Sequence, residues 1–340
     1  MAAVDTRVRS RETPDAGRPL LSVHELTVDY LTPRGPARAV DHVSFTIGPG
    51  EILGLAGESG CGKSTAAHAI MRLIKPPGRI TTGVVRFRDR DVMLMSEREL
   101  LDFRWRQVSI VFQSAMNALN PVLSIGAQIS DAIRAHTRTS RRQAWERATE
   151  LFELVGIDTG RLHSFPHQLS GGMRQRAVIA MALALNPDLI ILDEPTTALD
   201  VVVQRDILQQ IEELQARLGF SILFITHDLS LLVEVSTRIA VMYAGKIVES
   251  ATARDLFDEP LHPYTVGLME SFPSITGPKE RLEGIPGAPP DLITPPRGCR
   301  FHPRCPQCSL ARPDLYQLQT EVEPVLREVR PGHWVACHLY

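Results

Sequence analysis

The sequence has no hydrophobic run long enough to cross a membrane. Its longest uninterrupted apolar segment, Ala177 to Leu185, falls well short of the roughly 20 residues that a transmembrane helix needs. Any membrane role is therefore expected to depend on protein partners. The first residues also lack the apolar core of a secretory signal, and we expect residues 1–19 to be a disordered lead-in.

An excess of charge of one sign is also absent. The 37 Lys and Arg residues nearly balance 39 Asp and Glu residues, for a net charge of −2 at pH 7. Nothing in this balance calls for a nucleic-acid partner. No internal repeat is evident, so we expect a single core. A length of 340 residues allows one large domain with an appendage.

Cysteine is scarce and unevenly placed. Cys61 lies in a glycine-rich loop, and the other four fall in the last part of the chain: Cys299, Cys305, Cys308 and Cys337. Because cytosolic proteins rarely keep structural disulfides, this group favours a metal site over cross-links. Frequent prolines exclude long regular elements there, and we expect residues 277–340 to form a small, loop-rich module.

The rest of the chain alternates strand and helix patterns. Residues 21–47 alternate apolar and polar positions around a turn at Thr32–Pro36, which predicts antiparallel strands with one solvated face. Later apolar runs separated by helical stretches predict a mostly parallel sheet covered on both faces; these runs are Ile52–Ala56, Val108–Phe112, Leu189–Leu192 and Ile222–Ile225. Residues from about 124 to 186 are expected to form an inserted helical subdomain.

The strongest local signal is a glycine-rich loop between the run Ile52–Ala56 and a helical stretch. It has the pattern G-x-x-x-x-G-K-[ST], in which backbone N–H groups and a helix N-terminus surround phosphates. Lys63 is expected at the β- and γ-phosphates and the Ser64 hydroxyl at Mg²⁺. The residues expected to bind nucleotide are Gly57, Glu58, Ser59, Gly60, Cys61, Gly62, Lys63, Ser64 and Thr65.

Two carboxylates end a later apolar strand, at Asp193 and Glu194. Such a pair is costly to place at the end of a buried strand without a cation. Asp193 suits Mg²⁺, directly or through water, and Glu194 suits the catalytic task of polarising the attacking water.

A second glycine-containing helix start stands at Leu169–Met173. Ser170 suits an N-cap, and Gly171 and Gly172 allow an anion to approach the backbone closely. The chain thus has two anion-binding helix starts but one lysine-bearing loop. This combination predicts a head-to-tail dimer in which each Ser170 helix start contacts the ATP held by the opposite subunit.

These motifs, in this order over roughly residues 20–250, resemble those of ABC-family ATPases. The resemblance implies an α/β fold with a P-loop ABC ATPase core over residues 20–276. That core would carry an antiparallel β subdomain and the helical insert, followed by the small Cys- and Pro-rich C-terminal module.

The same resemblance implies further site residues. Tyr30 matches the aromatic residue that stacks on adenine, and Gln113 matches the glutamine that senses Mg²⁺ and the γ-phosphate. His227 matches the switch histidine of the catalytic site. The loop Ala198–Asp200 matches the segment that crosses between subunits, with Asp200 among its ATP contacts. Ser64, Gln113 and Asp193 would together hold Mg²⁺.

Four further segments are similar to the oligopeptide/dipeptide-permease branch of importers: Leu119–Gly126, Leu169–Arg176, Thr197–Val201 and His262–Thr265. This implies an ATP-hydrolysing subunit that drives peptide uptake from the cytoplasmic face of the inner membrane. Its partners would be a paralogous or identical ATPase, two transmembrane permease subunits and an extracytoplasmic substrate-binding protein. Nickel, glutathione and oligosaccharide importers share the branch and stay open as alternatives.

The four C-terminal cysteines suit a [4Fe–4S] cluster or Zn²⁺, and free thiols are the third possibility. In the family's pattern the third cysteine falls where Arg312 stands here, so ligation by Cys308 needs a different local loop. A non-transport ABC ATPase acting on DNA or ribosomes is the alternative class. The chain lacks the inserted coiled coil or second core of such proteins. An inactive scaffold is disfavoured because Glu194 and His227 are both present.

Overall fold

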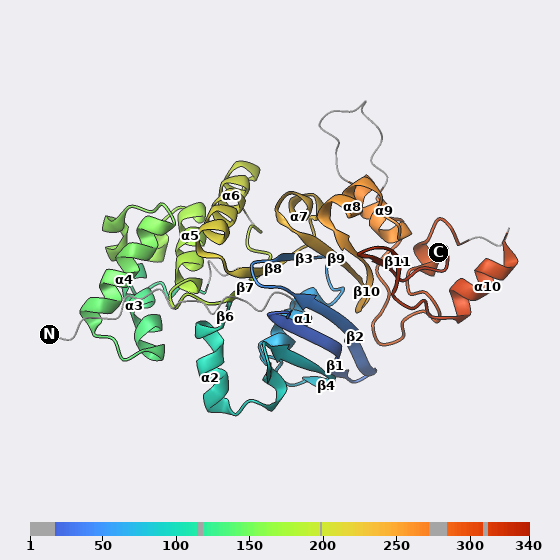
Figure 1. The fold of residues 1–340 in the computed structure, drawn as a ribbon, viewed down its shortest axis with the longest axis horizontal. Helices are drawn as coiled ribbons and strands as arrows, with labels where there is room; N and C mark the ends of the chain where they lie inside the picture. The colour runs from blue at the N-terminus through green and yellow to red at the C-terminus, as the bar shows by residue number, and fades with distance from the viewer. Residues whose placement is uncertain (1–17, 114–117, 198, 272–283, 309–311) are drawn as a thin grey trace.

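The computed structural model describes residues 18–113, 118–197, 199–271, 284–308 and 312–340 (Figure 1). Its strands are β1 (Leu21–Thr32), β2 (Gly35–Ile47), β3 (Ile52–Ala56), β4 (Gly78–Phe87), β5 (Arg90–Asp91), β6 (Val108–Val111), β7 (Leu189–Asp193), β8 (Ser221–Thr226), β9 (Arg238–Tyr243), β10 (Lys246–Thr252), β11 (Arg327–Arg330) and β12 (His333–Val335). Its α-helices are α1 (Lys63–Ile70), α2 (Glu97–Arg106), α3 (Ile125–His136), α4 (Arg141–Leu154), α5 (Gly171–Ala182), α6 (Val201–Leu218), α7 (Leu229–Val235), α8 (Ala253–Asp258), α9 (Pro263–Glu270) and α10 (Pro313–Glu321).

The first sheet is antiparallel, with strand order β2-β1-β4-β5. β1 and β2 form the hairpin predicted from the alternation in residues 21–47, and Thr32 pairs with Gly35 at its turn. Alternate residues of β1 such as Leu21 and Val23 are buried, because one face of the sheet packs on β3 and α1 in a shared hydrophobic cluster. The predicted antiparallel subdomain is confirmed.

The second sheet has the strand order β11-β12-β10-β9-β3-β8-β7-β6. Strands β9, β3, β8, β7 and β6 run parallel to one another, whereas β10 pairs antiparallel with β9. Every residue of β3, β7 and β8 is buried, as expected for parallel strands with both faces covered. All four apolar runs chosen from the sequence form strands of this sheet. The predicted parallel core is therefore confirmed.

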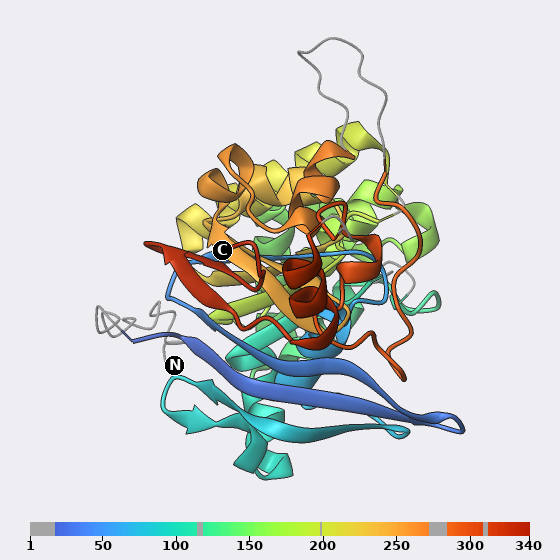
Figure 2. The same ribbon diagram turned by 90° about the vertical axis from the view of Figure 1, so that its right-hand side faces the viewer.

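The C-terminal part of the chain adds two strands to this same sheet. β12 pairs antiparallel with β10 through Glu249 and Val335, and β11 pairs with β12. The Oε1 atom of fully buried Glu249 in β10 lies 2.7 Å from the Nε2 atom of buried His333 in β12. This contact links the added strands to the sheet. Figure 2 shows the red C-terminal strands beside the central layer of the molecule. A boundary near residue 277 stays a prediction, but it does not separate two independent sheets.

Helices α3, α4 and α5 lie together at one end of the molecule, away from α1 (Figure 1). Their apolar faces join a large core cluster with β6, β7 and α6. Between residues 124 and 186, all of which the structure describes, no strand occurs. Among the described helices, none combines the length and apolarity that a membrane span requires.

Candidate functional site

The glycine-rich loop follows β3 and ends at α1, as predicted. Gly57 and Gly62 have φ angles of 144° and 110°, which L side chains rarely adopt. A Cβ atom at Gly57 would lie 2.1 Å from the Met242 carbonyl oxygen, and one at Gly62 would lie 2.1 Å from that of Ala39. Only glycine fits at these two positions, because β9 and β2 press directly against the loop.

The residues of the loop differ in their exposure to solvent. Ser59 and Gly60 are exposed at its tip, and Thr65 is half-buried in α1. Lys63 is 5% exposed, and its Nζ atom donates to the Gly57 carbonyl at 2.6 Å and to the Glu58 carbonyl at 3.0 Å. The ammonium group is therefore held at the loop instead of extending into solvent.

The loop is joined to the end of β7 by one hydrogen bond. Ser64 Oγ donates to Asp193 Oδ1 at 2.9 Å. Burial raises the pKa of the Asp193 carboxyl, and the hydrogen bond from Ser64 opposes that shift. A hydroxyl and a nearly buried carboxylate are oxygen donors of the kind that Mg²⁺ prefers. These residues therefore fit the predicted magnesium site.

Glu194 stands one residue beyond β7 in a strained backbone conformation. Its φ angle is +47°, which is unusual for a residue other than glycine and is often retained at functional sites. The Glu194 N–H donates to the Ile225 carbonyl oxygen of β8 at 2.8 Å. This contact fixes the direction in which the side chain leaves the sheet.

Three side chains converge on the Glu194 carboxylate, which is 12% exposed. His227 Nδ1 lies 3.2 Å from one carboxylate oxygen. Gln113 Nε2 donates to the other at 3.3 Å, and Thr197 Oγ1 donates to it at 3.0 Å. Glu194 and His227 directly follow β7 and β8, and Gln113 lies two residues beyond the end of β6. The carboxyl ends of these parallel strands share one edge of the sheet, the usual position of ligand sites in such sheets. Thr197 belongs to the segment Thr197–Val201 that resembles the permease branch, and its contact with Glu194 is visible only in the structure.

The second helix start is not part of this cluster. Ser170 caps α5 by accepting from the Met173 N–H at 3.2 Å, and Asp200 caps α6 by accepting from the Val203 N–H at 3.0 Å. Both residues are exposed. A Cβ on Gly172 would lie 2.8 Å from Val203, and one on Gly171 would lie 3.3 Å from Leu199, so α5 packs closely on the start of α6. Ala198 lies outside the described residues.

Tyr30 is half-buried on β1 and pairs with Ala37 of β2 and Gly78 of β4. Its ring packs against the cluster that includes β3 and α1. Among the described residues, no hydrogen bond joins Tyr30 to the phosphate loop. The predicted stacking of Tyr30 on adenine therefore stays a prediction.

The cysteines expected to hold a metal do not form a ligand group. Within the described part of the chain, no three His, Cys, Asp or Glu side chains are placed to hold a metal ion. Burial raises the pKa of Cys299 to about 12 and also raises those of Cys305, Cys308 and Cys337. The expected iron–sulfur or zinc site has no support from this geometry.

Comparison with known proteins agrees with the site. Residues 40–197 match the family model described as ABC transporter, and residues 248–310 match that of the oligopeptide/dipeptide transporter C-terminal region. A protein of Sinorhizobium fredii named a probable peptide ABC transporter ATP-binding protein is 44% identical over 97% of this chain and 97% of its own length. The oligopeptide transport ATP-binding protein OppD of Bacillus subtilis is 44% identical over 94% of this chain and 88% of its own.

Solved structures give the same result. An ATP-binding cassette determined as a dimer in a post-hydrolysis state with ADP and Pi is 29% identical, with a TM-score of 0.62 over 69% of this chain and 99% of that one. The cbiO1 protein of Clostridium perfringens, part of an ABC transporter complex, is 26% identical, with a TM-score of 0.62 over 71% of this chain and 91% of that one. The chain therefore belongs to the ATP-binding proteins of ABC transporters, ATPases coupled to transport, and to those members that carry the oligopeptide/dipeptide transporter C-terminal region.

Proposed function

We propose that this chain is the ATP-hydrolysing subunit of a peptide importer and that Glu194 is its catalytic carboxylate. The observation that carries the proposal is the position of Glu194, whose carboxylate lies between His227 and Gln113. The preceding residue, Asp193, accepts the hydrogen bond from Ser64 of the phosphate loop. The peptide substrate is inferred from relatives named for oligopeptide and dipeptide transport.

The phosphate loop would bind the nucleotide. Lys63 would exchange its contacts with the loop carbonyls for the β- and γ-phosphates, and the backbone N–H groups of the loop would hold the remaining oxygens. Ser64 and Asp193, with the amide of Gln113, would hold Mg²⁺. When bound, that ion would supply positive charge to the phosphate oxygens.

Glu194 would orient the attacking water and accept its proton. The water oxygen forms a bond to the γ-phosphorus, the bond between that phosphorus and the bridging oxygen breaks, and ADP leaves. His227, 61% exposed beside Glu194, is free to contact the γ-phosphate. Thr197 and Gln113 keep the carboxylate in one orientation through their hydrogen bonds.

A second ATPase subunit would complete the site through Ser170, Gly171, Gly172 and Asp200. Ser170 and Asp200 face solvent in the single chain. Val201 and Val202, next to Asp200, are 79% and 71% exposed, an apolar pair that a partner could cover. The related cassette whose solved structure is dimeric supports this arrangement.

Mixing two inactive variants tests this dimer. Each ATP site would need Lys63 from one subunit and Ser170 from the other. Ser170→Arg and Lys63→Ala should therefore each be nearly inactive alone, because a homodimer of either variant lacks one of these residues at both sites. A mixed dimer retains one site with an intact Lys63 and an intact opposing Ser170. Phosphate release should therefore rise above that of either variant when they are combined, with the rise depending on their ratio. Absence of any recovery would contradict a self-paired dimer and favour a paralogous partner.

The permease subunits would bind on the side of the helical subdomain. Val122, Leu123 and Phe165 are exposed there, at 75%, 38% and 37%. The segment just after Gln113 would add to this contact; its residues 114–117 lie outside the described residues. This attachment would place the ATPase at the cytoplasmic face of the membrane, with an extracytoplasmic binding protein delivering the peptide. No metal at the C-terminal cysteines is part of the proposal.

Peptide uptake by cells tests the substrate. A strain without this chain should take up a radiolabelled di- or oligopeptide more slowly, and the wild-type gene should restore uptake whereas Glu194→Gln should not. Uptake of nickel, glutathione and an oligosaccharide serves as the comparison. Unchanged peptide uptake together with a defect in one of these three would overturn the peptide assignment and leave the ATPase role intact.

A further inference from the structure

Glu58 links the phosphate loop to the C-terminal part of the chain. Its carboxylate accepts two parallel hydrogen bonds from the Arg304 guanidinium, Nη1 to Oε2 at 2.7 Å and Nη2 to Oε1 at 2.9 Å. The Arg304 side chain is 5% exposed and that of Glu58 is 26% exposed. A bidentate pair of this kind fixes orientation as well as charge.

The guanidinium of Arg304 has further contacts besides Glu58, with a backbone carbonyl and two aromatic rings. Its Nε atom donates to the Pro286 carbonyl at 2.7 Å. The rings of Tyr243 and Phe301 lie 5.8 and 6.0 Å from its carbon atom. Those rings pack edge to face at 5.2 Å. Arg304 therefore presents a rigid fork to the loop.

A second contact holds the backbone of the same loop residue. The Glu58 N–H donates to the Tyr264 hydroxyl at 2.8 Å. Tyr264 is fully buried in α9 and packs against Tyr243, with ring centroids 4.6 Å apart. Both the side chain and the backbone of Glu58 are thus fastened by residues beyond position 260.

We propose that Arg304 is a positioning residue for nucleotide binding that acts through Glu58. Phosphate-binding N–H groups are effective only when the loop that carries them is already ordered. A carboxylate next to Gly57 also places a negative charge in the loop that must accept an anionic nucleotide. Arg304 offsets that charge and holds the loop in shape, so the C-terminal region forms part of the nucleotide site. This inference rests on nucleotide binding at the loop, as proposed above.

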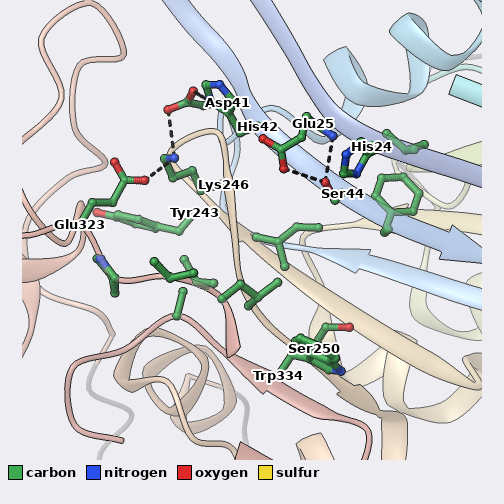
Figure 3. Close-up of a pocket in the computed structure, with 18 of the residues that line it drawn as sticks. His24, Glu25, Asp41, His42, Ser44, Tyr243, Lys246, Ser250, Glu323 and Trp334 are labelled. Atoms are coloured by element: carbon green, nitrogen blue, oxygen red, sulfur yellow. Dashed lines mark hydrogen bonds and ion pairs between the residues drawn. The ribbon is translucent and has the colours of Figure 1, made fainter. Parts of the chain in front are cut away.

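Arg300 supplies a matched control within the same segment. It is 10% exposed and pairs with buried Asp41 of β2, and it makes no hydrogen bond to residues 57–65. Asp41 also binds Lys246, which pairs in turn with Glu323, at one end of a cleft of about 940 Å³ (Figure 3). Arg300 also donates to the Ala244 carbonyl, and the adjacent Gly245 N–H donates to the Cys61 carbonyl at 2.9 Å. Arg300 therefore attaches the C-terminal region to the core and reaches the phosphate loop only indirectly, through this turn.

Equilibrium binding of Mg-ATP to the full chain tests the proposal. We expect Arg304→Met to weaken binding about tenfold, within the usual range of coupling between sites, because the Glu58 charge becomes unpaired. Arg300→Met should lower the melting temperature but leave ATP affinity within about twofold, since it spares the loop. Adding Glu58→Gln to Arg304→Met should recover most of the lost affinity, because the uncompensated charge is then removed.

Three results would overturn the proposal: normal ATP affinity in Arg304→Met, an equal loss in Arg300→Met, or no recovery on adding Glu58→Gln. If Arg304→Met does not fold, Arg304→Lys and Arg300→Lys take its place. A several-fold loss of affinity is expected only in Arg304→Lys, and equal affinities would refute the inference. If the wild-type chain binds Mg-ATP and Lys63→Ala abolishes that binding, the phosphate loop is established as the nucleotide site. A negative result for the Arg304 variants would then leave the proposed function unaffected.

Discussion

Replacement of Glu194 by Gln is expected to lower steady-state ATP turnover by about 10²–10⁴-fold, the usual cost of losing a general base. The amide keeps the size of the side chain and can still accept hydrogen bonds from Thr197 and Gln113. It cannot take a proton from the attacking water. The phosphate loop is untouched, so Mg-ATP should bind with nearly wild-type affinity.

Phosphate release and equilibrium ATP binding, measured on the same preparation, separate these two effects. The variant should accumulate as an ATP-bound dimer on size exclusion, because the two subunits hold ATP between them and the dimer is no longer released by hydrolysis. Turnover close to that of the wild type would show that Glu194 is not the catalytic carboxylate. Loss of ATP binding along with turnover would instead indicate damage to the neighbouring Asp193–Ser64 pair.

Replacement of Lys63 by Ala should impair binding itself. Hydrogen bonds to charged groups contribute about 1.5–3 kcal/mol each, so loss of contacts to two phosphates should weaken ATP affinity by roughly 100-fold or more. The change also leaves the Gly57 and Glu58 carbonyls without their present donor. Hydrolysis should therefore be undetectable at ATP concentrations that saturate the wild type.

Lys246→Ala is the control for Lys63→Ala. Lys246 pairs with Asp41 and Glu323 and has no hydrogen bond or ion pair with residues 57–65, so ATP affinity should change little. Isothermal calorimetry and phosphate release on both variants make the comparison. If Lys63→Ala retained both affinity and hydrolysis, the loop would not be the phosphate site.

Much of the site could be read from the sequence because its parts are local patterns. The loop needs its glycines within a few residues of Lys63, and the apolar run Ile52–Ala56 forms β3 with the bounds expected of it. The pair Asp193 and Glu194 stands at the end of an apolar run, which places both at a sheet edge whatever the rest of the chain does. The positions of Gln113 and His227 came from resemblance alone, and the structure places both against Glu194.

Contacts between distant segments could not be read in this way. Strand β4 pairs with β1, and β11 (from Arg327) and β12 extend a sheet whose first strand in the chain, β3, begins at Ile52. Nothing in the composition of these strands identifies their neighbours. The expectation that four cysteines gather around a metal also failed to find support in the described residues. Spacing along a proline-rich segment does not determine which thiols meet.

The sequence by itself determined the chemistry of this protein: a phosphate loop, a carboxylate pair and the helix start at Ser170, each encoded by neighbouring residues whose backbone needs are local. Only the tertiary structure decided how the loop is supported. Arg304 and Tyr264 reach Glu58 across 246 and 206 positions, and such pairs form because burial of Phe301 and Tyr243 brings the segments together. A buried guanidinium requires a partner for its charge, but which carboxylate supplies it depends on the packing of the whole chain.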